Sequence, residues 1–337
     1  MRRFYLATTI PAGLVALGAI LGGWWSALGL IFMTSLTFLL DSLVSQRNAE
    51  VEEPESEFPA GDTLLVAIAF IHFALFVLVV WSISNGGQST SANCALFLSA
   101  GLYFGQVSNS AAHELIHRSR RTFRRLGMWT YISILFGHHT SAHMLVHHRY
   151  VATPNDPNSA RLGESFYTYL VRAWIGSFKQ GYKAEAVRLE TAKRSLFRNP
   201  YLMYGSGSCL TLITAFLIGG AFGLTVYIGL AFYATAQLLL SDYVQHYGLS
   251  RKVKDDKAEP TNEFHSWDSP HWFSSSLTLN APRHSEHHAR PAQPYTKLSH
   301  PNTGPMLPHS LPAMATLALF PSRWRRVMDH RAMKWQN

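Results

Sequence analysis

Nine histidines gather in four short segments of the chain, and their spacing suits metal binding. A neutral imidazole is a strong ligand for iron, copper, zinc and nickel, and histidines three or four residues apart lie on one face of a helix. A single histidine beside apolar residues is usually a packing residue, but this arrangement exceeds what packing requires. The candidate ligands are His113 and His117; His143, His147 and His148; His246; and His284, His287 and His288.

The first segment, HELIH at 113–117, is by itself also the signature of zinc metalloproteases, in which the glutamate activates a metal-bound water. The second would place His143 and His147 on one helix face, with His148 about 100° away. The third, 284–288, has spacings of three and four residues. A zinc protease has no use for the second and third segments. The set therefore favours two metal ions with room for a small ligand.

His246 stands alone, and a lone histidine of this kind is more often a packing residue. Its position at the end of an apolar segment, beside Asp242, makes it a plausible ninth ligand. The nine imidazoles would suit zinc, copper, iron or nickel. Zinc is redox-silent and rarely needs so many ligands, so a pair of iron ions is favoured.

Carboxylates near these segments could orient the rings through their second ring nitrogen. The candidates are Glu114, Asp156, Asp242 and Glu286. Four neighbouring histidines are left outside the ligand set, namely His138, His139, His265 and His271.

The elements that must position these residues belong to a membrane protein. The chain has 337 residues, of which 47% are hydrophobic and 15% charged. A bilayer core needs about 20 apolar residues per helix. We predict a single domain, 1–337, that is an all-α integral membrane protein with about six transmembrane helices. We expect the segments 113–207 and 246–337 to be cytoplasmic and to include a helical cap, residues 127–200 and 250–337, that carries the di-metal site. The spans are about 4–22, 24–44, 63–82, 92–112, 208–223 and 225–245.

The net charge of +9 indicates the orientation. With the N-terminus inside, the basic clusters at 118–125, 251–254 and 323–326 all face the cytoplasm, as does the acidic segment 50–57. We therefore expect a multi-pass protein of a bacterial-type inner membrane, with both termini and the metal site cytoplasmic. These clusters flank spans, so they fit contact with membrane lipid or with an acidic electron-transfer protein better than nucleic acid.

The two cysteines, Cys94 and Cys209, lie inside predicted spans and have no metal-binding spacing. An iron–sulfur or cysteine-ligated redox centre must therefore be on another protein.

At the histidine segments the chain resembles the membrane-bound non-haem di-iron alkane hydroxylases, within the integral-membrane fatty acid desaturase and hydroxylase superfamily. The likeness runs from span four to the C-terminal region. It includes HELIHR at 113–118, HMLVHHRYVATPNDPNSAR at 143–161, DYVQHYGL at 242–249, HSWDSPH at 265–271, RHSEHHARPAQPY at 283–295 and ALFPSRWRRVMDHR at 318–331.

The resemblance implies an oxidoreductase similar to alkane 1-monooxygenases. Two Fe ions, held by the nine histidines, would use O2 to hydroxylate the terminal carbon of an apolar hydrocarbon to a primary alcohol. Electrons would come from a rubredoxin or ferredoxin and its NAD(P)H reductase.

Four residues depart from the family pattern. Ala142 stands in place of glutamate, Val146 in place of glycine, Asp242 in place of asparagine, and Gln245 in place of glutamate. Glutamine at the last position is similar to the xylene and cymene monooxygenases, which oxidise methyl groups on aromatic rings. Alkylaromatic hydroxylation and lipid desaturation or hydroxylation are therefore alternatives within the class. A membrane zinc metalloprotease on HELIH and a metal transporter are alternatives from other classes.

Overall fold

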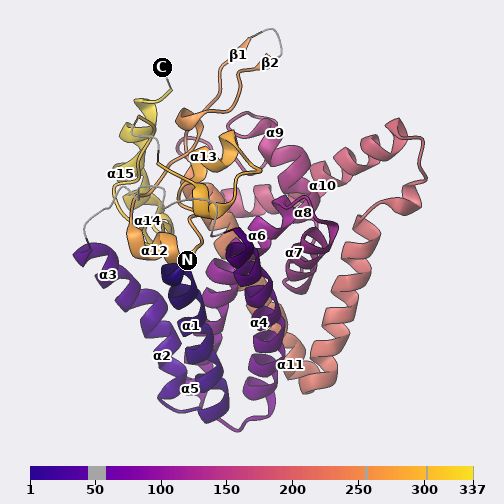
Figure 1. Cartoon of the computed structure of the whole chain (residues 1–337), viewed down its shortest axis with the longest axis vertical. Helices are drawn as coiled ribbons and strands as arrows, with labels where there is room; N and C mark the ends of the chain where they lie inside the picture. Colours follow the sequence, from indigo (N-terminus) through magenta and orange to yellow (C-terminus); the bar gives the residue numbers. More distant parts are fainter. Residues whose placement is uncertain (45–57, 255–256, 301–302, 337) are drawn as a thin grey trace.

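The computed structural model describes residues 1–44, 58–254, 257–300 and 303–336 and is almost entirely helical (Figure 1). Long helices form a bundle, and the remaining helices and loops form a cap at one end of it. The expected all-α architecture is confirmed, apart from a small antiparallel hairpin in the cap, β1 (Val253–Lys254) with β2 (Lys257–Ala258). The acidic segment 50–57 lies outside the described residues.

The first four predicted spans fall on four long helical stretches. Helices α1 (Arg2–Leu21) and α4 (Phe58–Asn85) are regular, whereas the other two stretches contain a π-helical turn. The second stretch is α2 (Trp25–Ile31), η1 (Phe32–Leu36) and α3 (Thr37–Leu43). The fourth is α5 (Thr90–Tyr103), η2 (Phe104–Ser108) and α6 (Asn109–His117).

The last two predicted spans form the helical segment α11 (Tyr201–His246), which is interrupted at Gly219 and Gly220. Gly220 has φ 60° and ψ −151°, a conformation that essentially only glycine adopts. The Tyr227 hydroxyl donates to Thr211 Oγ1 at 2.7 Å, although 16 residues of straight helix would span about 24 Å. The two halves therefore fold back on each other as a hairpin.

Among the described residues, four helices are long and apolar enough to cross a membrane: Arg2–Leu21, Trp25–Leu43, Gly61–Asn85 and Tyr201–His246. The last of these holds both halves of the α11 hairpin. The count of six spans stays a prediction.

The cap is built from two parts of the chain. Before α11 it contains α7 (Arg121–Ser133), α8 (His139–Ala142), η3 (His143–His147), α9 (His148–Tyr150), α10 (Phe166–Thr191) and η4 (Leu196–Arg198). After α11 and the hairpin it contains η5 (Glu263–His265), α12 (Trp272–Leu277), α13 (His284–Ala289), η6 (Tyr295–Lys297), α14 (Leu311–Ala318) and α15 (Pro321–Met333).

Polar contacts hold the cap against the bundle. Glu114 on α6 accepts a hydrogen bond from the Tyr295 backbone N–H at 3.2 Å and pairs with Arg118 at 3.3 Å. Arg118 also pairs with Asp62 of α4 at 2.9 Å. At the end of the second helical stretch, Asp41 Oδ1 accepts the backbone N–H groups of Phe273 and Ser274 at 3.1 and 3.0 Å. These belong to the first turn of α12, where no intrahelical acceptor is available.

Replacing Asp41 by alanine is expected to destabilise the protein, because it leaves the buried N–H of Ser274 and the half-buried N–H of Phe273 without an acceptor. Loss of a cap of this kind costs about 1–2 kcal/mol. We expect the midpoint of thermal unfolding in detergent to fall by a few degrees. Ser42→Ala is the matched control, because the exposed Ser42 hydroxyl donates only to Phe38 O within its own helix. Equal midpoints for the two variants would contradict the capping role of Asp41.

Candidate metal centre

The nine candidate histidines converge in two adjoining groups, each able to hold a metal ion. Within each group the ligand nitrogens lie within 4.8 Å of one another. The first group contains His113, His117, His143, His148 and His287, and the second contains His147, His246, His284 and His288. The sequence had left the division between two metals open. The folded chain separates them into five and four.

In the first group the Nε2 atoms face one another. His143 Nε2 lies 2.8 Å from that of His113, 3.1 Å from that of His117 and 2.9 Å from that of His148. His287 Nε2 lies 3.2 Å from His148 Nε2. Ligands bound about 2.1 Å from a metal ion, at right angles to one another, would have nitrogens about 3 Å apart. The spacing therefore fits a shared ion.

The second group has the same character. His284 Nε2 lies 3.0 Å from His246 Nε2 and 3.1 Å from His288 Nε2. The ring of His147 lies 4.9 Å from the His246 ring, centre to centre. His147 Nε2 is buried and has no hydrogen-bond partner in the described chain. A buried nitrogen left open beside three other ring nitrogens is what a metal ligand requires.

The second histidine segment is divided between the two groups, although the rings of His143 and His147, which were expected to share a helix face, have centres 5.2 Å apart. His143 belongs with His148, and His147 belongs to the other group. The reason is local: residues 143–147 form the π-helical turn η3, in which pairing runs from i to i+5. Because this turn is wider, it brings His143 close to His148, five residues later. His147 then lies with the other group.

The other two segments obey α-helical spacing. His113 and His117 on α6 share the first group, and His284 and His288 on α13 share the second, each pair four residues apart. His287 turns from α13 to the first group, as His147 turns from η3 to the second. Each of these two segments therefore supplies ligands to both groups.

Of the four candidate carboxylates, Asp156 contacts a ligand ring. His147 Nδ1 lies 2.8 Å from Asp156 Oδ2, and both side chains are buried. Asp156 also accepts the Ser159 hydroxyl at 2.7 Å and the Asn158 backbone N–H at 3.0 Å. With a proton on Nδ1 facing Asp156, the lone pair of His147 Nε2 is available to a metal.

The other three candidates have different hydrogen-bond partners. Glu114 joins α6 to η6 and Arg118, as described above. Asp242 accepts the Asn158 side-chain amide at 2.8 Å, one step beyond Asp156. Glu286 accepts the Ser299 hydroxyl at 2.8 Å and pairs with Arg290. In the part of the chain that the structure describes, none of these contacts reaches a ligand ring.

Burial sets the charge of the rings. It lowers the pKa of His143, His284 and His288 well below the usual value, and neighbouring histidines lower it further. These rings are therefore neutral, the form that binds metal. Burial also opposes protonation of His147, but the charge and hydrogen bond of Asp156 outweigh it and raise the pKa.

One contact to the site was not anticipated from the sequence. His246 Nδ1 lies 3.1 Å from the backbone carbonyl of His265, which therefore orients the ring. A carbonyl carries no residue-type signal, so sequence reasoning could not find it. His139, left outside the ligand set, is buried with its ring centre 5.0 Å from that of His143 but belongs to neither group. His138 and His271 contact Ser177 and Ser269 instead.

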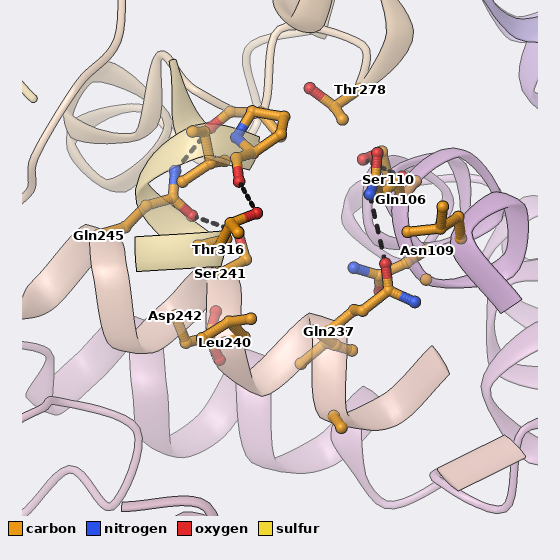
Figure 2. A pocket seen from close by; sticks show the side chains of 18 of the residues that line it. Gln106, Asn109, Ser110, Gln237, Leu240, Ser241, Asp242, Gln245, Thr278 and Thr316 are labelled. Carbon is orange, nitrogen blue, oxygen red and sulfur yellow. Dashed lines mark hydrogen bonds between the residues drawn. The ribbon is translucent and has the colours of Figure 1, made fainter. Parts of the chain in front are cut away.

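A cavity of about 640 Å³ extends from the metal centre between the helical stretches of the bundle. His113, His143 and His284 line one part of it. Its walls come from η1 and α3, from α5, η2 and α6, from the second half of α11, and from α14. Figure 2 shows part of its lining, with Gln106, Asn109, Gln237 and Gln245 among the labelled side chains. The sequence held no signal for this cavity, because its walls meet only in the folded chain.

The chain is similar to several proteins of known activity. The fatty acid desaturase family matches residues 89–317. The chain is 32% identical to alkane 1-monooxygenase 1 of Alcanivorax borkumensis, over 93% of this chain and 80% of that protein. It is 31% identical to alkane 1-monooxygenase 2 of Pseudomonas aeruginosa, over 90% and 83% respectively. It is 28% identical to the xylene/toluene monooxygenase hydroxylase component of Pseudomonas putida, over 96% and 86%.

Proposed function

This chain belongs to the fatty acid desaturase family, in which it groups with the alkane 1-monooxygenases, and we propose that it hydroxylates the terminal carbon of alkanes or similar hydrocarbon chains. The reaction consumes O2, two electrons and two protons and yields a primary alcohol and water. One observation carries the proposal: nine imidazoles converge in two adjoining groups, and three of them line a cavity between the helices.

We propose that the two groups hold two iron ions, with His113, His117, His143, His148 and His287 at one and His147, His246, His284 and His288 at the other. When bound, iron would supply the activation of oxygen. The imidazole ligands cannot supply it, because imidazole is not redox-active. Asp156 holds the His147 ring in the tautomer that ligates. The buried positions of most of these rings keep bulk water from the site.

The protein's own residues also position the substrate. Met33, Leu102, Leu238 and Leu240 provide apolar wall along the cavity, and the histidines lie at one part of it. A hydrocarbon entering from the lipid between the helices would therefore bring a carbon to the metal centre. We propose that a chain lying along this cavity presents its end to the histidines, where the reacting carbon is held close to the metals.

The partners and location follow from the same argument. The described cysteines, Cys94 and Cys209, are exposed and unpaired, so we propose that electrons come from a rubredoxin or ferredoxin with its NAD(P)H reductase. We propose one membrane-embedded domain in a bacterial inner membrane, with both termini and the metal centre on the cytoplasmic side. The basic clusters at 118–125 and 323–326 then face the donor protein and anionic lipid.

A second candidate is hydroxylation of a methyl group on an aromatic ring. The glutamine at position 245 is similar to the xylene and cymene monooxygenases. Gln245 lines the cavity, accepts a hydrogen bond from the Ser241 hydroxyl at 2.9 Å and donates one to Ala281 O at 3.0 Å. The zinc protease alternative is disfavoured, because Glu114 of HELIH is bound to Arg118 and the Tyr295 backbone and does not activate water.

Metal analysis and turnover test the proposal together. We expect purified protein to hold about two irons per chain. Membranes supplied with a reduced rubredoxin or ferredoxin should convert octane to 1-octanol faster than p-xylene to its benzylic alcohol. Faster conversion of p-xylene would favour the second candidate. Stoichiometric zinc without iron would refute the oxygenase.

A further inference from the structure

Helix α10 of the cap presents a row of exposed side chains that are all apolar or aromatic. The row follows one face of the helix, because its members are four, four, three and four residues apart. It contains Tyr167, Val171, Ile175, Phe178 and Tyr182, each between 46% and 60% exposed. We call these five residues the α10 stripe. Figure 1 shows α10 running sideways from the cap, away from the long axis of the bundle, before the chain turns back into α11.

The other side of α10 packs on the cap. The Ser177 hydroxyl lies 3.3 Å from His138 Nε2, and Glu185 accepts the Ser141 hydroxyl at 2.7 Å. Helical spacing places the buried residues of this side opposite Val171 and Ile175. They are Phe166, Tyr169, Ala173, Ser177 and Gly181. The α10 stripe therefore faces away from the cap.

Ring contacts show which way the stripe side points. The Trp174 ring, next to the stripe, stacks on the Phe232 ring with centres 5.8 Å apart. Phe232 lies 14 residues before His246 in the second half of α11, about 21 Å along the helix from the end that reaches the metal centre. The Phe178 ring lies 5.2 Å from that of Tyr201, the first residue of α11. The rings of α10 therefore point along a membrane helix, away from its cap end.

The α10 stripe adjoins apolar surface of that membrane helix. Phe232 is 53% exposed, and Ile228, one turn earlier, is 45% exposed. The Tyr182 ring lies 5.3 Å from the Tyr201 ring, so the far end of the stripe also meets α11. Exposed apolar side chains of a membrane helix face lipid hydrocarbon. A stripe that contacts them at two places lies in the same surroundings.

The residue types beside the stripe fit the edge of a bilayer. Lys179 and Lys183 each directly follow a member of the stripe and lie along one edge of it, so their ammonium groups extend to the headgroups. Tyrosine and tryptophan, here Tyr167, Trp174 and Tyr182, are typical of the headgroup level. No aspartate or glutamate occurs in residues 167–183. An apolar face bordered by lysines is characteristic of a helix that lies in the membrane interface.

We propose that α10 lies in the plane of the membrane surface, with its stripe in lipid and with Lys179 and Lys183 at anionic headgroups of the same leaflet. A bilayer supplies both partners, hydrocarbon for the stripe and negative charge for the lysines. Interfacial helices bury their apolar face about 5–10 Å into the boundary between headgroups and acyl chains. The cap then contacts lipid through α10, whichever reaction the metal centre performs.

Fluorescence quenching on the full-length protein tests the position of the stripe. Cys94 and Cys209, both exposed and unpaired, are replaced by alanine, and Ile175→Cys is labelled with an environment-sensitive fluorophore. The protein is reconstituted in vesicles of phosphatidylcholine and phosphatidylglycerol. Lipids brominated in the upper part of their acyl chains quench from the membrane, and iodide quenches from water. We expect brominated lipid to lower the emission at least about twofold, and iodide to have little effect.

Val187→Cys is the matched control. Val187 is an exposed aliphatic residue of the same helix, at 51% against 49% for Ile175, but it lines a pocket that α10 shares with η3 and α9. Its label should be quenched by iodide and not by lipid. Equal quenching by iodide at both positions would place the stripe in water and overturn the proposal. Protection of the Ile175 label from both quenchers would reveal a protein cover, such as a second copy, and would overturn it as well.

The headgroup contact is tested by comparing brominated phosphatidylglycerol with brominated phosphatidylcholine at equal mole fraction. We expect the anionic lipid to quench the Ile175 label at least about twofold more strongly. Replacing both lysines by glutamine (Lys179→Gln, Lys183→Gln) should abolish this preference. Replacing both by arginine (Lys179→Arg, Lys183→Arg) should preserve it, because the charge is retained. An equal preference in all three proteins would show that these lysines do not contact headgroups and would overturn that part of the proposal.

Discussion

His284→Ala is expected to remove about one metal equivalent per chain and to lower hydroxylation by more than about 100-fold. His284 belongs to the four-membered group, so its loss leaves three imidazoles, His147, His246 and His288. Removing a residue that merely orients a ligand typically costs 10–100-fold in affinity or activity, and losing a ligand should cost more. Metal content by elemental analysis and octane turnover are the two measurements.

His271→Ala is the matched control for this prediction. His271 is close in sequence, but its ring contacts the Ser269 hydroxyl at 2.8 Å and belongs to neither group. It should retain the full metal content. A zinc protease on HELIH requires a single ion and predicts that His284→Ala leaves metal and activity intact. Such a result would remove the basis for a two-metal oxygenase.

Asp156→Asn is expected to weaken metal binding at the four-membered group by about 10–100-fold, because the amide no longer supplies the negative charge that makes His147 a strong ligand. Burial favours the protonated form of Asp156, but His147 and the hydrogen bonds from Ser159 and Asn158 outweigh it and lower its pKa, so the native group is a carboxylate. Chelator competition on purified protein measures the affinity, and excess iron should restore part of the activity.

Glu286→Gln makes the same chemical change at a carboxylate whose partners are Ser299 and Arg290. Its effect on metal affinity should stay below about threefold, far less than that of a residue orienting a ligand. If the two variants weaken metal binding equally, the contact between Asp156 and His147 has no special role in the site.

The metal centre could be predicted largely from residue types. The ability to bind metal belongs to the imidazole side chain, and the clustering of these histidines led to nine predicted ligands, including the isolated His246. The structure brings the same nine rings into two groups able to hold metal ions, and their role as ligands stays a prediction. The long helices were predictable for a similar reason, since apolar length alone identifies a membrane helix. Even the interruption of α11 was predictable near Gly219, because glycine tolerates the backbone reversal.

The arrangement around those residues was not predictable. A π-helical turn at η3, which nothing in residues 143–147 signals, decides that His143 joins His148 and not His147. Of four carboxylates near the histidines, packing alone decides that Asp156 contacts a ring. The contact that orients His246 is made by the backbone carbonyl of His265. Every residue has such a carbonyl, so residue types could not predict this contact.

The chemical groups of the site were therefore determined by the sequence, because a ligand's type belongs to the residue itself. The partition of the ligands into two groups and the close approach of the helices around the cavity were decided by the tertiary structure. Both depend on how separate helices meet, as where Gly105 on one helix admits Gln237 from another, 132 positions later in the chain. Contacts between residues so far apart depend on packing, which no local pattern encodes.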